Sequence, residues 1–206
     1  MRDAQSEARR IIQDEHRSIS AVLSGLKDLA RLAQDPKLKP GFDVLRAMIY
    51  YIDAFPERMH HPKEDRHLFA KLLEREPSAR ALVESLQSEH VQGASLVRDL
   101  EQALLKFEEL WPRGAAEFAA AVERYARFHW DHMRREEHQV LPLCEAALTA
   151  EDWEEIHAAF AGNEDPIADL RQSDFTSLFQ RIVSLAPEPV GLGPQWRRGG
   201  TSPAGP

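Results

Sequence analysis

The stretch HHPKED at residues 60–65 decides how we interpret this chain. It places two histidines beside a proline and follows them with two acids, late in a segment that otherwise has a helical pattern. Two pairs with i, i+4 spacing are possible within it: His60 with Glu64, and His61 with Asp65. Residues four apart lie on the same face of a helix, so either pair presents an imidazole and a carboxylate together.

A second stretch, HMRREE at residues 132–137, repeats the form H-x-x-x-E followed by an acid. Its pair is His132 with Glu136, and the same register in the first stretch selects His60 with Glu64. His61 and Asp65 of the first stretch are then each one residue beyond this pair and lie off the helix face that carries His60 and Glu64.

Helical periodicity extends outward from both stretches over most of the chain. Two prolines, Pro56 and Pro62, interrupt the second helical segment, and Pro142 interrupts the fourth, so we expect bends there. Ser78 is a candidate N-cap for the third helical segment. No segment alternates with period two. We therefore predict an all-α, up-down-up-down four-helix bundle, with helices at about residues 4–33, 42–75, 78–110 and 115–148.

The chain beyond the bundle should contain shorter elements. Thr149 with Asp152 resembles a capping box and opens a helix that we expect to reach about Ala161. A further short helix is expected at 174–185, followed by an end rich in Pro and Gly. The predicted organisation is a bundle at 1–148, a short helical C-terminal extension at 149–186 and an irregular tail at 187–206.

Two further histidines complete a pattern that repeats along the chain. His16 lies in the first helix, 44 residues before His60, and His90 lies in the third, 42 residues before His132. In antiparallel hairpins of about 30-residue helices, these positions fall at nearly the same height. His16 also shares an apolar stripe with Ile12. We therefore expect four imidazoles and two carboxylates in one layer inside the bundle.

Such a layer predicts a metal site. A buried carboxylate without a partner costs several kcal/mol, and divalent cations supply that partner. Imidazole with carboxylate suits Fe, Mn or Zn, and the set is too large for one tetrahedral zinc ion. It suits two octahedral ions bridged by both glutamates and an oxo or hydroxo group, each keeping an open position. The predicted ligands are His16, His60, Glu64, His90, His132 and Glu136.

The order His…HHxxED…His…HxxxEE resembles the hemerythrin-like (HHE cation-binding) family over about residues 8–148. The resemblance implies a non-haem di-iron centre in a four-helix bundle, holding two Fe ions through the same six residues. It also implies a small diatomic ligand, oxygen or nitric oxide, or a role in sensing redox state or handling iron.

One position departs from the oxygen-carrying members, which place a fifth histidine one turn after the third-helix histidine. Here that position is Ala94, preceded by Gly93. The chain looks more like the four-histidine branch, which resembles proteins implicated in the repair of damaged iron centres. His67 and His129 are candidates for a replacement ligand.

Several acids and one cysteine have plainer interpretations. Glu15 and Glu89 each precede a predicted ligand and either form salt bridges or guard access to the site. Cys144 is expected to be a small buried residue.

Two other classes of function remain open. A ferritin-like di-iron oxidase uses Glu-x-x-His, and the chain contains this pattern at Glu64 with His67 and at Glu154 with His157. However, the second pattern lies outside the bundle and leaves His132 unexplained. The other alternative is a structural or interaction protein that uses the helices after residue 149 and retains a vestigial metal site.

The charge and composition of the chain limit the partners and the cellular compartment that we expect for it. The formal net charge of −8 gives no electrostatic support for nucleic-acid binding. No apolar run approaches the length that crosses a bilayer, and the polar start lacks the core of a signal peptide. A single cysteine suits a reducing compartment, so we expect a cytoplasmic protein without a membrane partner.

Overall fold

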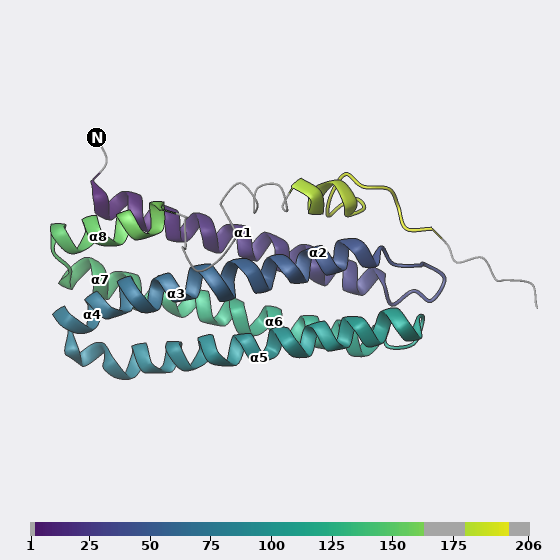
Figure 1. Cartoon of the computed structure of the whole chain (residues 1–206), viewed down its shortest axis with the longest axis horizontal. Helices are drawn as coiled ribbons and strands as arrows, with labels where there is room; N and C mark the ends of the chain where they lie inside the picture. Colours follow the sequence, from purple (N-terminus) through teal and green to yellow (C-terminus); the bar gives the residue numbers. More distant parts are fainter. Residues whose placement is uncertain (1–2, 163–179, 198–206) are drawn as a thin grey trace, which may run out of the picture.

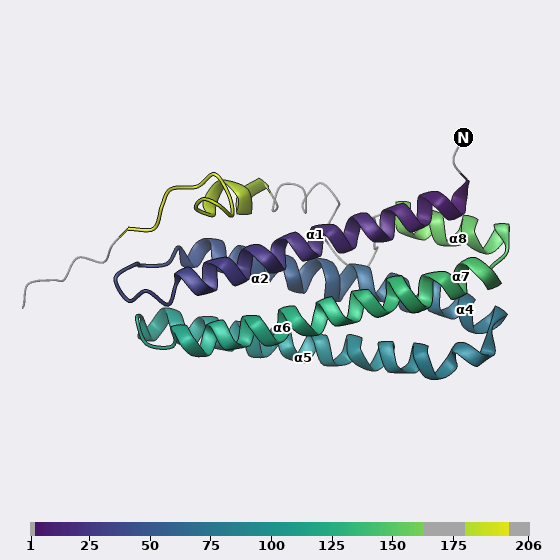
Figure 2. The same ribbon diagram turned by 180° about the vertical axis from the view of Figure 1, so that it is seen from behind.

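The computed structural model describes residues 3–162 and 180–197, and most of these are helical. Four helical columns lie side by side and alternate in direction (Figures 1 and 2). In chain order they are α1 (Ala4–Leu32), then α2 (Phe42–Ile52) through α4 (Ala70–Arg75), then α5 (Arg80–Leu110), then α6 (Ala115–Arg135) with α7 (Leu141–Ala147). This arrangement confirms the predicted up-down-up-down bundle.

The second column remains a continuous helix through both of its prolines, Pro56 and Pro62. It continues from α2 through the π-helical segment η1 (Asp53–His60), the short α3 (His61–Lys63) and a second π-helical segment, η2 (Glu64–Phe69). Proline lacks an N–H group and clashes with the carbonyl four residues earlier, and a wider π turn accommodates both effects. The predicted bends are therefore wide turns within a continuous column.

The fourth column also contains a π-helical segment near a proline. Its π-helical segment η4 (Glu136–Val140) lies between α6 and α7 and ends two residues before Pro142. Glu64 and Glu136 are each the first residue of a π-helical segment. Such segments are frequent at functional sites.

The caps decide where the helices begin. Ser78 does not cap α5 as predicted, because a 3₁₀ turn, η3 (Pro77–Ala79), comes first and the Glu76 side chain accepts from the Ser78 N–H. The predicted capping box of Thr149 and Asp152 is confirmed, and it opens α8 (Ala150–Ala161).

Two apolar clusters fill the bundle, one on each side of the predicted polar layer. One contains Leu26, Leu45 and Phe107 and extends toward the α1–α2 and α5–α6 connections. The other contains Leu72 and Phe160 and includes the buried Cys144. In every column the predicted ligands lie between residues of these two clusters, so the polar layer is enclosed by apolar packing at both ends.

The segments after the bundle pack against it. Helix α8 lies along α1 and buries Trp153, Ile156 and Phe160 (Figure 1). Of the predicted helix at 174–185, residues 180–185 are helical and residues 174–179 lie outside the described part. Ile182 and Ala186 are buried in the first apolar cluster.

The predicted irregular tail is described as far as residue 197, and this part contains turns and bends rather than helix. Residues 198–206 lie outside the described part. Within the described ranges, no helix has both the length and the apolar character needed to cross a bilayer.

Candidate metal centre

The four histidines of the repeated pattern meet in two pairs. His16 of α1 and His60 at the end of η1 place their Nε2 atoms 3.0 Å apart. His90 of α5 and His132 of α6 place theirs at the same separation, 3.0 Å. All four side chains are buried. The structure thus brings the predicted histidines into one layer, as their positions in the helices indicate.

The two predicted carboxylates lie between these pairs. Glu64 directs Oε1 to His60 Nε2 at 3.2 Å and Oε2 to His90 Nε2 at 3.6 Å. Glu136 directs Oε1 to His132 Nε2 at 2.9 Å and Oε2 to His16 Nε2 at 3.5 Å. Each carboxylate therefore offers one oxygen to each histidine pair, which is the arrangement of a bridging ligand.

This arrangement fits a pair of cations. In an octahedral ion with ligands at about 2.1 Å, neighbouring nitrogens lie about 3.0 Å apart, which is the separation within each histidine pair. All four oxygens of Glu64 and Glu136 are buried without a hydrogen-bond partner among the described residues. Buried anionic oxygens need a compensating charge. Two overlapping ligand groups result: His16, His60, Glu64 and Glu136, and Glu64, His90, His132 and Glu136.

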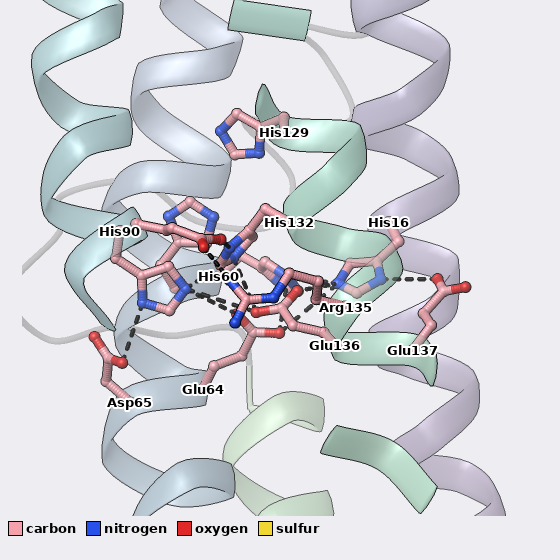
Figure 3. Close-up of polar contacts among 12 residues, drawn as sticks. His16, His60, Glu64, Asp65, His90, His129, His132, Arg135, Glu136 and Glu137 are labelled. Atoms are coloured by element: carbon pink, nitrogen blue, oxygen red, sulfur yellow. Dashed lines mark hydrogen bonds and ion pairs between the residues drawn. The ribbon is translucent and has the colours of Figure 1, made fainter. Parts of the chain in front are cut away.

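In each of these four histidines, the nitrogen that faces away from the layer, Nδ1, lies close to a further carboxylate. The Nδ1 atoms of His16 and His90 lie 2.9 Å from Glu137 Oε1 and 3.1 Å from Asp65 Oδ1, as Figure 3 shows at opposite sides of the layer. The Nδ1 atom of His60 lies 2.7 Å from Glu15 Oε2, and the Nδ1 atom of His132 lies 2.9 Å from Glu89 Oε2. Such contacts fix the ring orientation and direct Nε2 toward the site.

The contacts of two of these outer carboxylates, Glu15 and Glu89, follow a repeat: each residue that they contact in the second column has an equivalent 72 residues later in the fourth column. Glu15 contacts His60 and lies 3.7 Å from Lys63, and at the equivalent place Glu89 contacts both His132 and Arg135. Glu15 and Glu89 thus orient histidines, a role that our sequence interpretation did not include. The Glu-His dipeptide that occurs at both places was the signal for it.

Electrostatics couple the histidines to the carboxylates. Burial opposes protonation of His60, but Glu64 and Glu15 raise its pKa to about 10. The same balance raises the pKa of His132 to about 10, with Glu136 as its largest charge partner. Burial and the neighbouring Glu136 raise the carboxyl pKa of Glu64, but His60 and His16 outweigh them and lower this pKa to about 2. Burial likewise raises the carboxyl pKa of Glu136, but His132 outweighs it and holds the pKa well below its usual range. A cation that binds these groups must therefore displace protons from the imidazoles.

A second buried polar group lies beside the layer and was missed at the sequence level. Its centre is the Glu57 carboxylate, which accepts a hydrogen bond from the Tyr125 hydroxyl at 2.8 Å and lies 3.1 Å from His129 Nε2. His61 Nδ1 is 3.5 Å from the other Glu57 oxygen. Burial raises the carboxyl pKa, but the neighbouring imidazoles of His129 and His61 outweigh it and hold the Glu57 pKa well below its usual range.

The proposed replacement ligands do not join the layer. Among the described residues, neither His67 nor His129 belongs to a potential metal-binding group, although His61 forms one with His90 and His132. Figure 3 shows His129 displaced from the layer along the bundle. The ferritin-type pair Glu154 and His157 on α8 also belongs to no such group within this part of the chain.

A surface cavity of about 600 Å³ opens on one side of the layer, between α1 and α6. Its lining includes His16, Met133 and Glu137, together with Arg17, Trp130 and Arg134. The cavity therefore approaches the His16 side of the layer.

Comparison with known families supports this interpretation of the site. The family model described as the hemerythrin HHE cation-binding domain matches residues 7–144. The matched range includes every histidine and carboxylate of the layer and ends before α8. A search of curated proteins found no match.

Proposed function

Because the chain belongs to the hemerythrin HHE cation-binding family, we propose that its buried layer holds two iron ions as a non-haem di-iron centre. The proposed ligands are His16, His60, Glu64, His90, His132 and Glu136. In this proposal, Glu64 and Glu136 bridge the two ions, and each histidine pair completes the protein ligands of one ion.

The observation that carries the proposal is the position of the two carboxylates. Each turns one oxygen toward one histidine pair and the other oxygen toward the second pair. A site for one ion would bring all the ligands to a single point, whereas these residues converge on two points. Imidazole and carboxylate together suit iron, and none of the six residues offers the thiolate that favours copper(I) or iron–sulfur clusters.

We further propose that the centre binds or senses oxygen or nitric oxide, or handles iron in a stress response or in the repair of iron centres, in the cytoplasm. Bound iron would supply redox chemistry and open coordination positions. The protein would hold the imidazoles in place through Asp65, Glu137, Glu15 and Glu89 and exclude bulk water with the two apolar clusters. Support comes from the enclosed layer and from the cavity that approaches it at His16.

The test is anaerobic reconstitution of the full chain with Fe(II), followed by metal analysis and optical spectra before and after addition of oxygen and nitric oxide. We expect two irons per chain and near-ultraviolet bands of an oxidised bridged pair, with a distinct response to nitric oxide. One iron or none per chain would overturn the di-iron proposal. An unchanged spectrum with both gases would overturn the diatomic-ligand role and leave iron handling.

Two variants connect the result to the proposed residues. Glu136→Gln removes a bridging charge at constant size and should lower the iron content, whereas His157→Ala on α8 should leave it unchanged. Loss of iron in the His157 variant would instead support a ferritin-type site that uses Glu154 and His157.

A further inference from the structure

Phe160 of α8 lies against the polar layer, although it is outside the range that the family model matches. Its side chain is fully buried, and its ring centroid is 6.4 Å from that of His60 in an edge-to-face arrangement. The Lys63 ammonium lies 5.6 Å from the centre of the same ring. Resting on the proposed di-iron centre, we propose that Phe160 is a positioning residue for the ligand His60, acting through Lys63 and Glu15.

Four side chains connect α8 to the layer in series. The Lys63 Nζ atom lies over the Phe160 ring and 3.7 Å from Glu15 Oε1. The other Glu15 oxygen, Oε2, lies 2.7 Å from His60 Nδ1. Glu15 Oε1 is buried and has no hydrogen-bond partner among the described residues, so the nearby ammonium compensates its charge. An aromatic ring face attracts an ammonium ion, and this attraction opposes the tendency of lysine to extend toward solvent. Phe160 therefore keeps the Lys63 charge beside the carboxylate that holds His60.

The other half of the repeat has the same contacts but is less covered. There Glu89 contacts both His132 and Arg135. The side chains of Glu89 and Arg135 are 22% and 27% exposed, compared with 8% and 11% for Glu15 and Lys63. Helix α8 packs along α1 and against η2, which is the side that carries Glu15 and Lys63. Because water screens charges, the covered ion pair is the one that holds its histidine more firmly.

Ion pairs fix the opposite end of α8 to the second column. Asp152, in the first turn of α8, accepts hydrogen bonds from Arg75 at 2.7 and 3.0 Å. Lys71 lies 2.7 Å from Glu155 of α8. Both basic residues belong to α4. The helix is thus attached to α4 near its start and reaches the metal layer near its end, so its position over Lys63 is defined.

Loss of the Phe160 ring should release Lys63 toward solvent and leave Glu15 with a weaker charge partner. His60 would then be oriented less firmly, and the cation that it shares with His16 would be held less tightly. The histidine pair of the other position does not depend on this series. The inference thus makes the two cation positions unequal, because a helix outside the family range supports only one of them.

The experiment measures release of Co(II) from the fully loaded full chain to excess EDTA, followed by the visible absorption of bound Co(II). Phe160→Leu keeps a buried apolar side chain but removes the ring. From this variant, half of the Co(II) should leave about tenfold faster than from the wild type, as for loss of other groups that orient a ligand. The other half should leave at the wild-type rate. Acceleration of both halves, or of neither, would overturn the inference.

Two further variants separate positioning from simple loosening of α8. Ile156→Val removes one buried methylene group from the same helix and should leave both release rates unchanged. Lys63→Met removes the charge and should reproduce the effect of Phe160→Leu, and combining the two changes should add little, because both interrupt the same series. Equal release from the Phe160 and Ile156 variants, or additive effects of the Phe160 and Lys63 changes, would contradict the assignment.

A second readout needs no metal. In NMR spectra of the metal-free wild-type protein, the His60 Nδ1–H proton bonded to Glu15 should exchange slowly with solvent. In Phe160→Leu this exchange should be about tenfold faster, whereas that of the His132 Nδ1–H proton should not change. Unchanged exchange at His60 would overturn the inference. If the wild-type chain takes up no cation, the di-iron proposal fails, and the proton exchange still decides whether Phe160 positions His60.

Discussion

The Glu57 carboxylate occupies the space that a side chain at Gly93 would need, with Oε1 only 2.9 Å from the position of a β-carbon. Alanine normally stabilises a helix interior by about 1 kcal/mol relative to glycine. Here the methyl group would displace a carboxylate held by Tyr125 and His129.

We therefore expect Gly93→Ala to lower the unfolding free energy of the wild-type protein by about 1 to 3 kcal/mol, as overpacking does. In a Glu57→Ala background the same change should raise it by about 1 kcal/mol. Urea unfolding of the four proteins measures the difference. Equal effects of Gly93→Ala in both backgrounds would show that the two residues are not coupled.

The outer carboxylates should control metal affinity without binding the metal. Glu89 holds His132 through Nδ1 at 2.9 Å, so Glu89→Gln should weaken cation binding by about 10-fold to 100-fold. Isothermal titration of the metal-free protein with Co(II) or Fe(II) provides the measurement. Glu84→Gln, an exposed acid on the same helix, is the control. If both variants bind like the wild type, Glu89 does not orient His132.

Cation binding should stabilise the bundle. The oxygens of Glu64 and Glu136 are buried without hydrogen bonds, so the folded state alone provides the site. At a thousandfold excess of free metal over Kd, linkage predicts about 4 kcal/mol of stabilisation. This corresponds to a rise in Tm of about 8 to 16 °C for a chain of this length. Thermal unfolding with and without metal tests it, and Glu64→Gln combined with Glu136→Gln should abolish the rise.

Asp152 should make stability depend on pH. Hydrogen bonds from Arg75 hold the Asp152 carboxyl pKa well below its usual value of 3.8. Because the pKa is lowered on folding, this stabilisation is present above about pH 4 and decreases as the pH falls below it. Asp152→Asn should therefore cost about 1 to 2 kcal/mol at pH 7 and progressively less toward pH 3.

Chemical unfolding at both pH values measures this change for the Asp152 variant. Asp131→Asn removes an exposed partner of Arg134 and should change stability by less than about 0.5 kcal/mol at either pH. An equal cost of Asp152→Asn at pH 7 and pH 3 would contradict the assignment.

The spacing of histidines and acids was sufficient to predict the bundle and the polar layer. His60 and Glu64 are four residues apart, and local helix geometry alone places such pairs on one face. The prolines were harder to interpret, because local rules predict that Pro62 bends or breaks a helix. The structure instead continues the column through π-helical turns on either side of it.

What the sequence by itself determined was the set of groups at one height, because helix rise and periodicity depend only on the local chain. Tertiary structure decided which acid meets which histidine: Asp65 reaches His90, and Glu137 reaches His16. It also decided the place of His61. In a regular α-helix, His61 lies about 100° around the axis from His60 and so faces another neighbour. Packing against α5 and α6, together with the π turns beside it, places its ring next to His90. Contacts between columns depend on how each helix is rotated about its axis, and only packing fixes that rotation.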